Sequence, residues 1–475
     1  MAVFSYRTVW SLAGPNIISN VLMVSISFAH LSIVAPFGRE ASAAVVTGGR
    51  VHFLLMAASM ALSVATTAVV ARAWGADDKA EASAATTSSL VLSVLLSLIL
   101  GSITFAAAPQ IVSLFGLDTQ TAALAVDYIR PASLLNIVFS LMLAVATSFR
   151  AIGDVIRPLR FIAFGTLFSI AGSYVLVRGA FGLPAMGVSG IPWGTAGGQS
   201  IIVLWFACRW FSRRYVLTPQ TGDALNMSRL RLLANIGGPA ALEQILIQVS
   251  FLLFMMLISG YGTAAFAAYG IGITVLSVTI VVGLGFGTAS ATLSGQRLGA
   301  KDAAGAVASG WAAMRLAILG MSTLAVLTFF FRGPIAAVLS ADEAVRAHTE
   351  YFVLILAIVQ PLMAVEFAIG GALRGAGDTK FPLIVTFAGM IVGRLSIGLL
   401  VRAVGGPIEA MYAVIIVDYT IKALLLILRF RNINWLELEI HPQAPLALQS
   451  VAGVSRGTVR SFFSRRNGSG SASDK

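Results

Sequence analysis

The sequence predicts an all-α polytopic membrane protein with about twelve transmembrane helices in two pseudo-symmetric six-helix lobes. Composition is the first observation behind this fold class, because 57% of the 475 residues are hydrophobic and only 11% are charged. Soluble domains carry about 25% charged residues. Apolar runs of roughly 18 residues or more, long enough to cross a bilayer, recur along most of the chain.

An internal repeat is the second observation. Residues 372–383 read ALRGAGDTKFPL, and residues 148–159 read SFRAIGDVIRPL, a weaker copy. The copies are offset by 224 residues (374 − 150 = 224), and this offset holds without a gap from about residue 14 to residue 159. Each copy contains an even number of spans, so we expect an axis along the membrane normal to relate them, with a cavity between the lobes.

Hydropathy places six spans in each copy. The first six lie at about 13–36, 45–71, 86–108, 122–148, 158–180 and 185–208; the second six lie at about 236–260, 264–292, 307–331, 349–373, 382–402 and 406–428. The chain is therefore predicted to divide into an N-terminal lobe (1–208), a linker (209–235), a C-terminal lobe (236–430) and a largely disordered basic tail (431–475).

Charge predicts the orientation. Lys and Arg concentrate in loops on one side, so the positive-inside rule places both termini and the linker in the cytoplasm. We expect a multi-pass protein of the inner (plasma) membrane. The net charge of +12 thus reports topology, and we expect no nucleic-acid partner. Cys208 is the single cysteine, which excludes an intrachain disulfide framework and a cysteine-rich metal site. The apolar run after Arg7 is interpreted as the first span, not as a signal peptide.

The sequence resembles the multidrug and toxic compound extrusion (MATE) family up to about residue 430. The resemblance rests on ALRGAGDT at 372–379, GQRLGA at 295–300 with its echo ARAWGA at 71–76, and GVSGIPWGTA at 187–196. It implies two six-helix lobes around a central cavity and export of organic cations in exchange for H⁺ or Na⁺. One position departs from the family: His30 occupies the place in span 1 where many bacterial members have a proton-binding aspartate.

Polar side chains follow one stripe in several spans, and this spacing is typical of helices that line a water-filled cavity. Hydrogen bonds between helices are the alternative use of such side chains. The predicted cavity-lining residues are Asn16, Asn20 and Ser27 in span 1, Ser59 and Ser63 in span 2, Asn136 and Ser140 in span 4, and Gln244 and Gln248 in span 7.

Ionisable residues within spans are costly, about 2.5–3.5 kcal/mol each on translocon scales, and are therefore candidates for function. Glu243, Glu366 and His30 are the candidates for ion coupling and substrate binding. Many family members have an acid in the same part of span 7, so Glu243 is favoured over Glu366, and His30 is expected only to tune the exchange. A histidine bonded to a neighbouring helix is the alternative for His30.

Seven further charged residues receive structural interpretations. Asp418 and Lys422 are predicted to form an i,i+4 pair, and Arg394 is a candidate to neutralise Glu366 or Asp418. The repeated turns are predicted to be local charged turns, in which Arg374 pairs with Asp378 and Arg150 pairs with Asp154.

The sequence therefore favours a secondary-active exporter of small, cationic, amphipathic molecules. We expect it to work as a monomer in membrane lipid, without a cofactor other than the coupling ion. A flippase for lipid-linked substrates, or a metabolite exporter of a related family, is the alternative within transport. A membrane-embedded enzyme is a weak alternative, because the four histidines form no metal-binding pattern and there is no Walker loop.

Overall fold

The structure is a computed structural model that describes residues 6–220, 222 and 225–437. These residues form helices and connecting turns, with no strand among them. They lie within one compact unit, Met1–Ile440, whereas the second unit, His441–Lys475, falls outside the described residues. The predicted disordered tail is thus undescribed from residue 438 onward.

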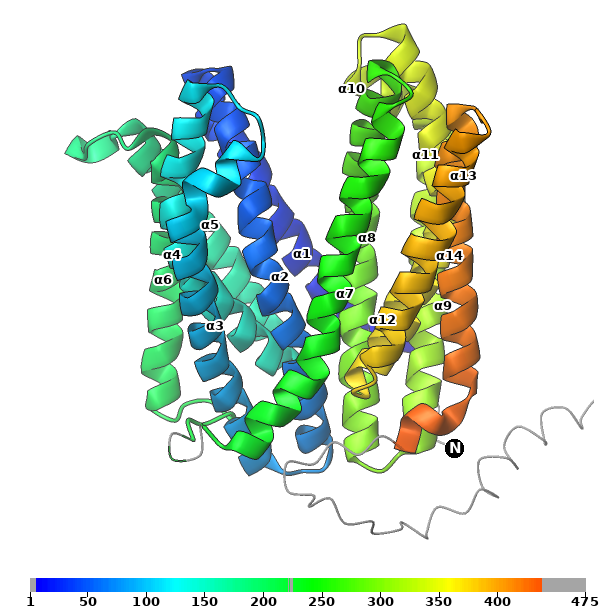
Figure 1. Ribbon diagram of the computed structural model, residues 1–475. Helices are drawn as coiled ribbons and strands as arrows, with labels where there is room; N and C mark the ends of the chain where they lie inside the picture. The colour runs from blue at the N-terminus through cyan, green and yellow to red at the C-terminus, as the bar shows by residue number, and fades with distance from the viewer. Residues whose placement is uncertain (1–5, 221, 223–224, 438–475) are drawn as a thin grey trace, which may run out of the picture. The chain divides into compact units, whose positions relative to one another are not determined.

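Six long helices form the first half of the chain (Figure 1): α1 (Tyr6–Val34), α2 (Arg39–Gly75), α3 (Lys79–Ser113), α4 (Thr119–Ala151), α5 (Ile156–Arg178) and α6 (Gly190–Phe211). Most of them extend several residues beyond the predicted spans. Polar residues at a helix end lower the local hydropathy without ending the helix, so hydropathy alone underestimates helix length.

The second half contains α7 (Met227–Ser259), α8 (Thr263–Gly299), α9 (Ala303–Phe330), the short α10 (Arg332–Leu339), α11 (Glu343–Gly375), α12 (Lys380–Phe387), the π-helical η5 (Ala388–Ser396), α13 (Ile397–Ala403) and α14 (Ile408–Arg431). α12, η5 and α13 follow one another without a break and count as one span, Lys380–Ala403. α7 begins inside the segment predicted as linker, because its first turns carry Arg229 and Arg231, which lower the hydropathy.

Eleven helical stretches among the described residues are long and apolar enough to cross a membrane by length and composition. α6 falls short, because glycines, a proline and a glutamine occupy its first half. With α6 the described helices supply six spans in each half (Figure 1). The predicted all-α polytopic fold of two lobes is confirmed, while the exact lobe boundaries 1–208 and 236–430 stay a prediction.

The repeat is visible in how the helices begin. An N-cap aspartate accepts hydrogen bonds from backbone N–H groups that the first turn of a helix leaves unpaired. Such caps start α3, α4, α9 and α11, and they fall in two pairs 224 residues apart: Asp78 with Asp302, and Asp118 with Asp342. The same local chemistry therefore sets the helix starts in both halves.

The turns repeat as well. Gly38 and Gly262 have φ angles of 103° and 102°, and Gly153 and Gly377 both have 88°. Each of these angles lies in the region that L side chains avoid, so glycine is required for the chain to reverse between helices at these points. The glycines that define the repeated motif are thus turn residues in both lobes.

The segment between α6 and α7 lies against the start of α3. Thr218 N donates a hydrogen bond to Ser83 Oγ at 3.2 Å, and Gln220 N donates one to Thr87 Oγ1 at 3.1 Å. Leu217, the residue before Thr218, is buried. Side chains one turn apart on α3 thus hold consecutive parts of the connection in place. We call the end of the helices at which this connection lies the linker end.

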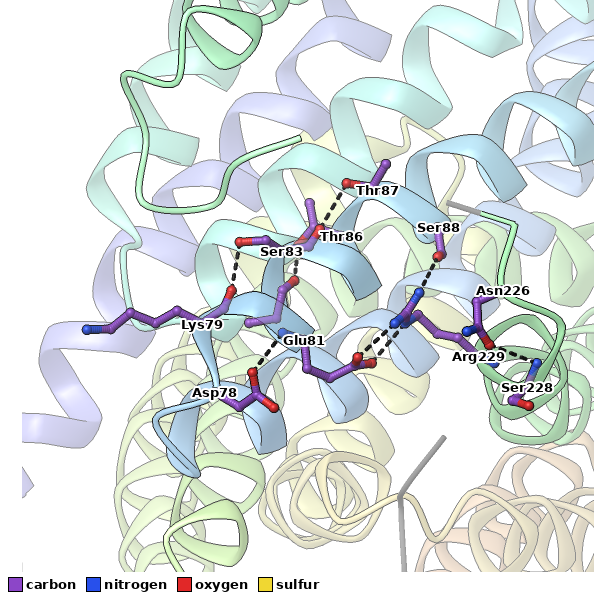
Figure 2. A network of polar contacts seen from close by, with 11 residues as sticks. Asp78, Lys79, Glu81, Ser83, Thr86, Thr87, Ser88, Asn226, Ser228 and Arg229 are labelled. Atoms are coloured by element: carbon purple, nitrogen blue, oxygen red, sulfur yellow. Dashed lines mark hydrogen bonds and ion pairs between the residues drawn. The ribbon is translucent and has the colours of Figure 1, made fainter. Parts of the chain in front are cut away.

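Glu81 and Arg229 join α3 to α7 beside that connection (Figure 2). Arg229 Nη2 lies 2.7 Å from Glu81 Oε2 and Arg229 Nε lies 2.8 Å from Glu81 Oε1, a bidentate pair. Asn226 caps α7 one turn earlier, which positions the first helical residues and Arg229 with them. A pocket of about 210 Å³ lies next to the pair, lined by Asp78, Ala80, Glu81, Ala84, Gln220 and Arg229. The ion pair therefore ties the first half of the chain to the first helix of the second half.

Candidate functional site

Glu243 lies one turn after Pro239 on α7, and its carboxylate is held from two other helices. Arg374 Nη2 on α11 lies 2.6 Å from Glu243 Oε1, and Arg374 Nε lies 3.4 Å from Glu243 Oε2. Thr386 Oγ1 on α12 donates a hydrogen bond to Glu243 Oε1 at 3.0 Å. Three helices thus converge on one buried carboxylate, which is almost fully satisfied by charge-assisted hydrogen bonds.

A second group of charges lies deeper in the same half, between α11, η5 and α14. Asp418 is ion-paired with Arg394 on η5. Lys422 Nζ lies 3.4 Å from Asp418 Oδ1, which confirms the predicted i,i+4 pair, and 3.4 Å from Glu366 Oε1 on α11. Of the two partners considered for Arg394, the structure selects Asp418. Arg394, Asp418 and Lys422 are essentially excluded from solvent.

The π-helical turns of η5 and their glycines bring α14 this close. A Cβ atom on Gly389 would lie 2.3 Å from Asp418 Oδ1 and 2.6 Å from Lys422 Cγ, so any larger residue would displace both side chains. π-Helical turns inside helices are rare and occur frequently at functional sites. The guanidinium of Arg394 also lies 5.3 Å from the ring centroid of Phe251, a cation–π distance.

We call these six charged side chains the second-lobe ion cluster: Glu243, Glu366, Arg374, Arg394, Asp418 and Lys422. Three acids face three bases, so the cluster is neutral when every member is ionised. Buried charges are tolerated in apolar surroundings when they are paired, and each of the six has an ion-pair partner within the cluster.

Glu366 has fewer and longer polar contacts than Glu243, and its side chain is the most exposed of the three acids. Its ion-pair partner is Lys422 at 3.4 Å, and Lys422 is shared with Asp418. Its side chain is 16% exposed, against 3% for Glu243 and 0% for Asp418. Glu366 is therefore the most exposed of the three acids and has a single ion-pair partner.

The first lobe has no matching cluster in its described residues. At an offset of 224, Glu243 corresponds to Ser19 and Glu366 corresponds to Met142. Arg374 corresponds to Arg150, which is buried and whose Nε and Nη2 have no hydrogen-bond partner among the described residues. Among the described residues, the ion pairs of the second-lobe ion cluster thus have no equivalent at the matching positions of the first lobe.

His30 lies where the resemblance places the aspartate of span 1, and it contacts α6. Its Nε2 lies 3.1 Å from Thr195 Oγ1, which in turn lies 3.3 Å from Ser173 Oγ on α5. The imidazole is buried. This is the alternative arrangement considered for His30, a histidine bonded to a neighbouring helix, and its proposed tuning role stays a prediction.

Two of the polar stripes hold helices together. Ser140 Oγ on α4 lies 2.6 Å from Ser59 Oγ on α2 and 2.7 Å from Ser97 Oγ on α3, and Asn136 joins the same group. Ser63 Oγ accepts a hydrogen bond from Thr147 at 3.2 Å. These contacts are the hydrogen bonds between helices that were the alternative to cavity lining.

The remaining predicted cavity residues are distributed more widely. Asn20 donates a hydrogen bond to Val281 O on α8 at 3.3 Å, and Asn16 donates one to Leu12 O within its own helix. Ser27 is exposed, and Gln244 and Gln248 are half-buried. A cavity-lining role for these five residues stays a prediction.

The predicted pairs inside the repeated turns were wrong. Arg374 pairs with Glu243, whereas Asp378 accepts hydrogen bonds from Arg429 Nη2 at 2.8 Å and Nε at 3.0 Å. The i,i+4 geometry needs an unbroken helix, and α11 ends at Gly375, before Gly377 turns the chain. Arg374 instead points back along α11, as helical side chains do, and reaches α7.

The first repeated turn deviates in the same way. Asp154 pairs with Arg157 at 2.8 Å and accepts a hydrogen bond from the Arg157 N–H group, so it closes the turn without Arg150. Asp378 accepts the equivalent bond from Phe381 N. The two aspartates are turn residues as predicted, and the two arginines lie in the last turns of α4 and α11.

Sequence reasoning missed Thr386 and Arg429 as partners of the cluster and the turn, and it missed the Glu81–Arg229 pair. These partners lie 143, 51 and 148 residues from the groups they contact. The available signal was an acid or base in an otherwise apolar helix, which indicates that a partner exists without indicating which residue it is.

The fold and the site define a class of protein: a duplicated, two-lobed helical membrane protein whose second lobe carries a neutral cluster of buried ions. The family model described as MatE matches residues 15–175 and 239–399, two segments separated by the repeat offset (239 − 15 = 224). The chain belongs to the MATE family and is a multi-pass membrane transporter.

Curated relatives agree with this assignment. The probable multidrug resistance protein NorM of Thermotoga maritima is 24% identical over 434 residues, which cover 89% of this chain and 92% of that protein. A protein of the same name from Pasteurella multocida is 31% identical over 60% of this chain and 65% of its own length. The multidrug resistance protein MdtK of Edwardsiella ictaluri is 28% identical over 58% and 61%, respectively.

Solved structures share the fold. A MOP superfamily transporter from Pyrococcus furiosus, described as having a binding pocket of reversed polarity that suggests a different function, superposes with a TM-score of 0.85 at 19% identity. The match covers 91% of this chain and 97% of that one. The bent form of the Vibrio cholerae MATE transporter VcmN gives a TM-score of 0.82 at 18% identity, over 90% and 96% of the two chains.

Proposed function

We propose that this protein exports organic cations across the inner (plasma) membrane in exchange for H⁺ or Na⁺, by alternating access of its two lobes. Membership of the MATE family and relatives named as multidrug resistance proteins support the transport class. The second-lobe ion cluster is the observation that carries the proposal, because buried acids whose partners can be exchanged are what a cation antiporter requires.

The exchange is assigned to the acids of the second lobe. The sequence favoured Glu243, but the geometry supports Glu366 as the residue that changes state, because Glu243 is held by Arg374 and Thr386 whereas Glu366 has one long contact with a shared lysine. A cation or a proton competes more easily for the carboxylate with fewer hydrogen bonds. Glu243 with Arg374 then serves as a fixed part of the lobe.

One exchanged proton supplies enough free energy. Moving one charge through 100 mV is worth about 2.3 kcal/mol. Because about 1.36 kcal/mol corresponds to a factor of ten, one net positive charge moved inward per cycle supports a gradient of roughly 50-fold. A one-for-one exchange of H⁺ for a monovalent cation moves no net charge and is driven by the pH difference alone.

Vesicle transport tests this assignment. Purified protein in liposomes is given a pH gradient or a Na⁺ gradient, and export of a fluorescent organic cation is followed for wild type, Glu366→Gln, Glu243→Gln and His30→Gln. Glu350→Gln is the matched control, because Glu350 lies on the same helix as Glu366 outside the ion cluster. We expect Glu366→Gln to abolish gradient-driven export, and His30→Gln and Glu350→Gln to retain it.

Two outcomes would overturn the proposal. Wild-type vesicles that export no cation under either gradient would remove the function. Loss of export on His30→Gln alone, with both glutamate variants near wild type, would move the exchange to the first lobe.

The orientation is tested separately. We propose that the linker end and both termini face the cytoplasm, since the basic loops gather there. In a Cys208→Ala background, Leu225→Cys should react with a membrane-impermeant maleimide only from inside, and Ala341→Cys only from outside. Labelling of both from the same side would contradict the twelve-span topology.

A further inference from the structure

Lys422 lies between two carboxylates inside the second lobe. Its ammonium nitrogen is 3.4 Å from Glu366 Oε1 and 3.4 Å from Asp418 Oδ1, and it lies 4.7 Å from the ring centroid of Tyr419. The side chain is 1% exposed. Two carboxylate oxygens and an aromatic face are ligands that suit a monovalent cation, and an ammonium group is a monovalent cation attached to a helix.

The charges around Lys422 are already balanced, so a second cation bound there would be uncompensated. Asp418 is paired through its other oxygen with Arg394, so two acids already face two bases. Adding Na⁺ would give this group a net positive charge in surroundings of low dielectric, which is strongly unfavourable. An Na⁺ ion could bind only after Lys422 had left.

The packing keeps Lys422 in place. Gly389 on η5 faces the lysine, and a Cβ atom there would lie 2.6 Å from Lys422 Cγ and 2.8 Å from Cε. The absence of a side chain on Gly389 thus makes the space that the lysine fills. Truncating the lysine would open a hole bordered by carboxylate oxygens of Glu366 and Asp418.

We infer that the ammonium group of Lys422 occupies the position of a coupling cation, so that the second lobe binds no Na⁺ and its exchange runs on protons. The statement that exchange runs on protons rests on the proposed function. The statement that Lys422 excludes Na⁺ can be tested by binding measurements without transport. A proton on Glu366 would release it from Lys422 and leave the lysine paired with Asp418. Arg374 on α11, Glu243 on α7 and Asp418 on α14 are the other charged groups near Glu366.

The first test measures Na⁺ binding to purified protein by ²²Na⁺ binding and by thermal unfolding, with K⁺ replacing Na⁺ in the control. We expect wild type to show no Na⁺-dependent change. Lys422→Ala should bind one Na⁺ per chain and gain a saturable rise in melting temperature of about 2–4 °C. Glu366→Gln in the Lys422→Ala background should remove that rise.

Lys422→Met is the matched control, because it removes the same charge but fills the same space. We expect it to bind no Na⁺. Saturable Na⁺ binding by wild type, no binding by a folded Lys422→Ala variant, or equal binding by the Ala and Met variants would each overturn the inference.

A second measurement decides the matter if Lys422→Ala does not fold. In wild-type vesicles at equal pH on both sides, an Na⁺ gradient should drive no export, whereas a pH gradient should drive export that is unchanged by Na⁺. Export driven by Na⁺ alone overturns the inference. If neither gradient drives export, the proposed function fails, and Na⁺ binding by wild-type protein still decides whether the lysine excludes Na⁺.

Discussion

Gly75 on α2 and Gly299 on α8 are one repeat apart, and each lies against the backbone carbonyl three residues before the other. A Cβ atom on Gly75 would lie 1.9 Å from Gln296 O, and one on Gly299 would lie 2.0 Å from Arg72 O. The two halves of the chain therefore meet at the linker end through a pseudo-twofold contact that only glycine permits. GQRLGA at 295–300 and ARAWGA at 71–76 are the two sides of this contact.

A side chain at this contact should force the two helices apart. We expect Gly299→Val to expose the buried Thr292 on α8, whose hydroxyl donates a hydrogen bond to Arg150 O on α4 of the first lobe. The measurement is the maleimide labelling rate of Thr292→Cys in a Cys208→Ala background, which should rise at least about tenfold, a shift of about 1.4 kcal/mol toward the open form.

Gly270→Val is the control for that experiment. Gly270 is on the same helix, but a Cβ atom added to it would have no neighbouring atom within 4 Å, so the substitution should leave the labelling rate unchanged. An equal rise with both variants would show that valine in α8 acts through the helix itself.

The Glu81–Arg229 pair should couple the stability of the two halves. At the repeat offset, Glu81 corresponds to Gly305 and Arg229 corresponds to Ser5. Neither counterpart is charged, so the pair has no equivalent elsewhere in the repeat. A double-mutant cycle with Glu81→Gln and Arg229→Gln should give a coupling energy of about 0.5–3 kcal/mol in thermal or denaturant unfolding.

The exposed Arg39–Glu40 pair is the control for this cycle. The Arg39 side chain is 94% exposed, so the same cycle there should give no measurable coupling. Equal coupling for the two pairs would mean that the buried geometry at Arg229 adds nothing.

The two turn aspartates should differ in their contribution to stability. Asp378 is 6% exposed and accepts two hydrogen bonds from Arg429, whereas Asp154 is 24% exposed and pairs with a half-exposed arginine. Asp378→Asn should therefore lower stability by about 1–3 kcal/mol, and Asp154→Asn by clearly less. Neither change should alter which cations are exported, and a change in substrate preference at normal expression would contradict the structural role.

A glutamate introduced at position 19 should form an ion pair with Arg150, as Glu243 does with Arg374 in the second lobe. Ser19 occupies the position of Glu243 (243 − 19 = 224), so Ser19→Glu would supply the partner that Arg374 has. We expect Ser19→Glu to raise the melting temperature relative to Ser19→Gln, and Arg150→Gln to cancel that gain. A gain that survives in the Arg150→Gln background would show that the new carboxylate pairs elsewhere.

The fold could be predicted because its signals are local. Apolar length identifies spans, and glycines and aspartates at turns identify the repeat. The Asp418–Lys422 pair was predictable for the same reason, since its members are four residues apart on one helix. The limit of this local reasoning is seen at Arg374, whose nearest acid in sequence is Asp378 but whose partner is 131 residues away.

The candidate site could be predicted only as a set of residues. Glu243, Glu366, Arg394 and Asp418 stand out because charge is rare in apolar helices. Which of them pair depends on how helices rotate and cross, and in η5 on a π-helical stretch that the sequence did not reveal. The sequence therefore indicated that the second lobe carries ions, while the proposed ranking of Glu366 above Glu243 rests on their hydrogen bonds.

The second-lobe ion cluster also makes the order in which the spans enter the membrane important. The first half enters the membrane with few ionisable groups inside its spans, whereas Glu366 and Arg394 enter the membrane before α14, which carries their partners Lys422 and Asp418. Each unpaired charge costs about 2.5–3.5 kcal/mol on translocon scales until then. The last span therefore completes the charge balance of the second lobe, because a chain that stops before residue 408 leaves Glu366 and Arg394 without these partners.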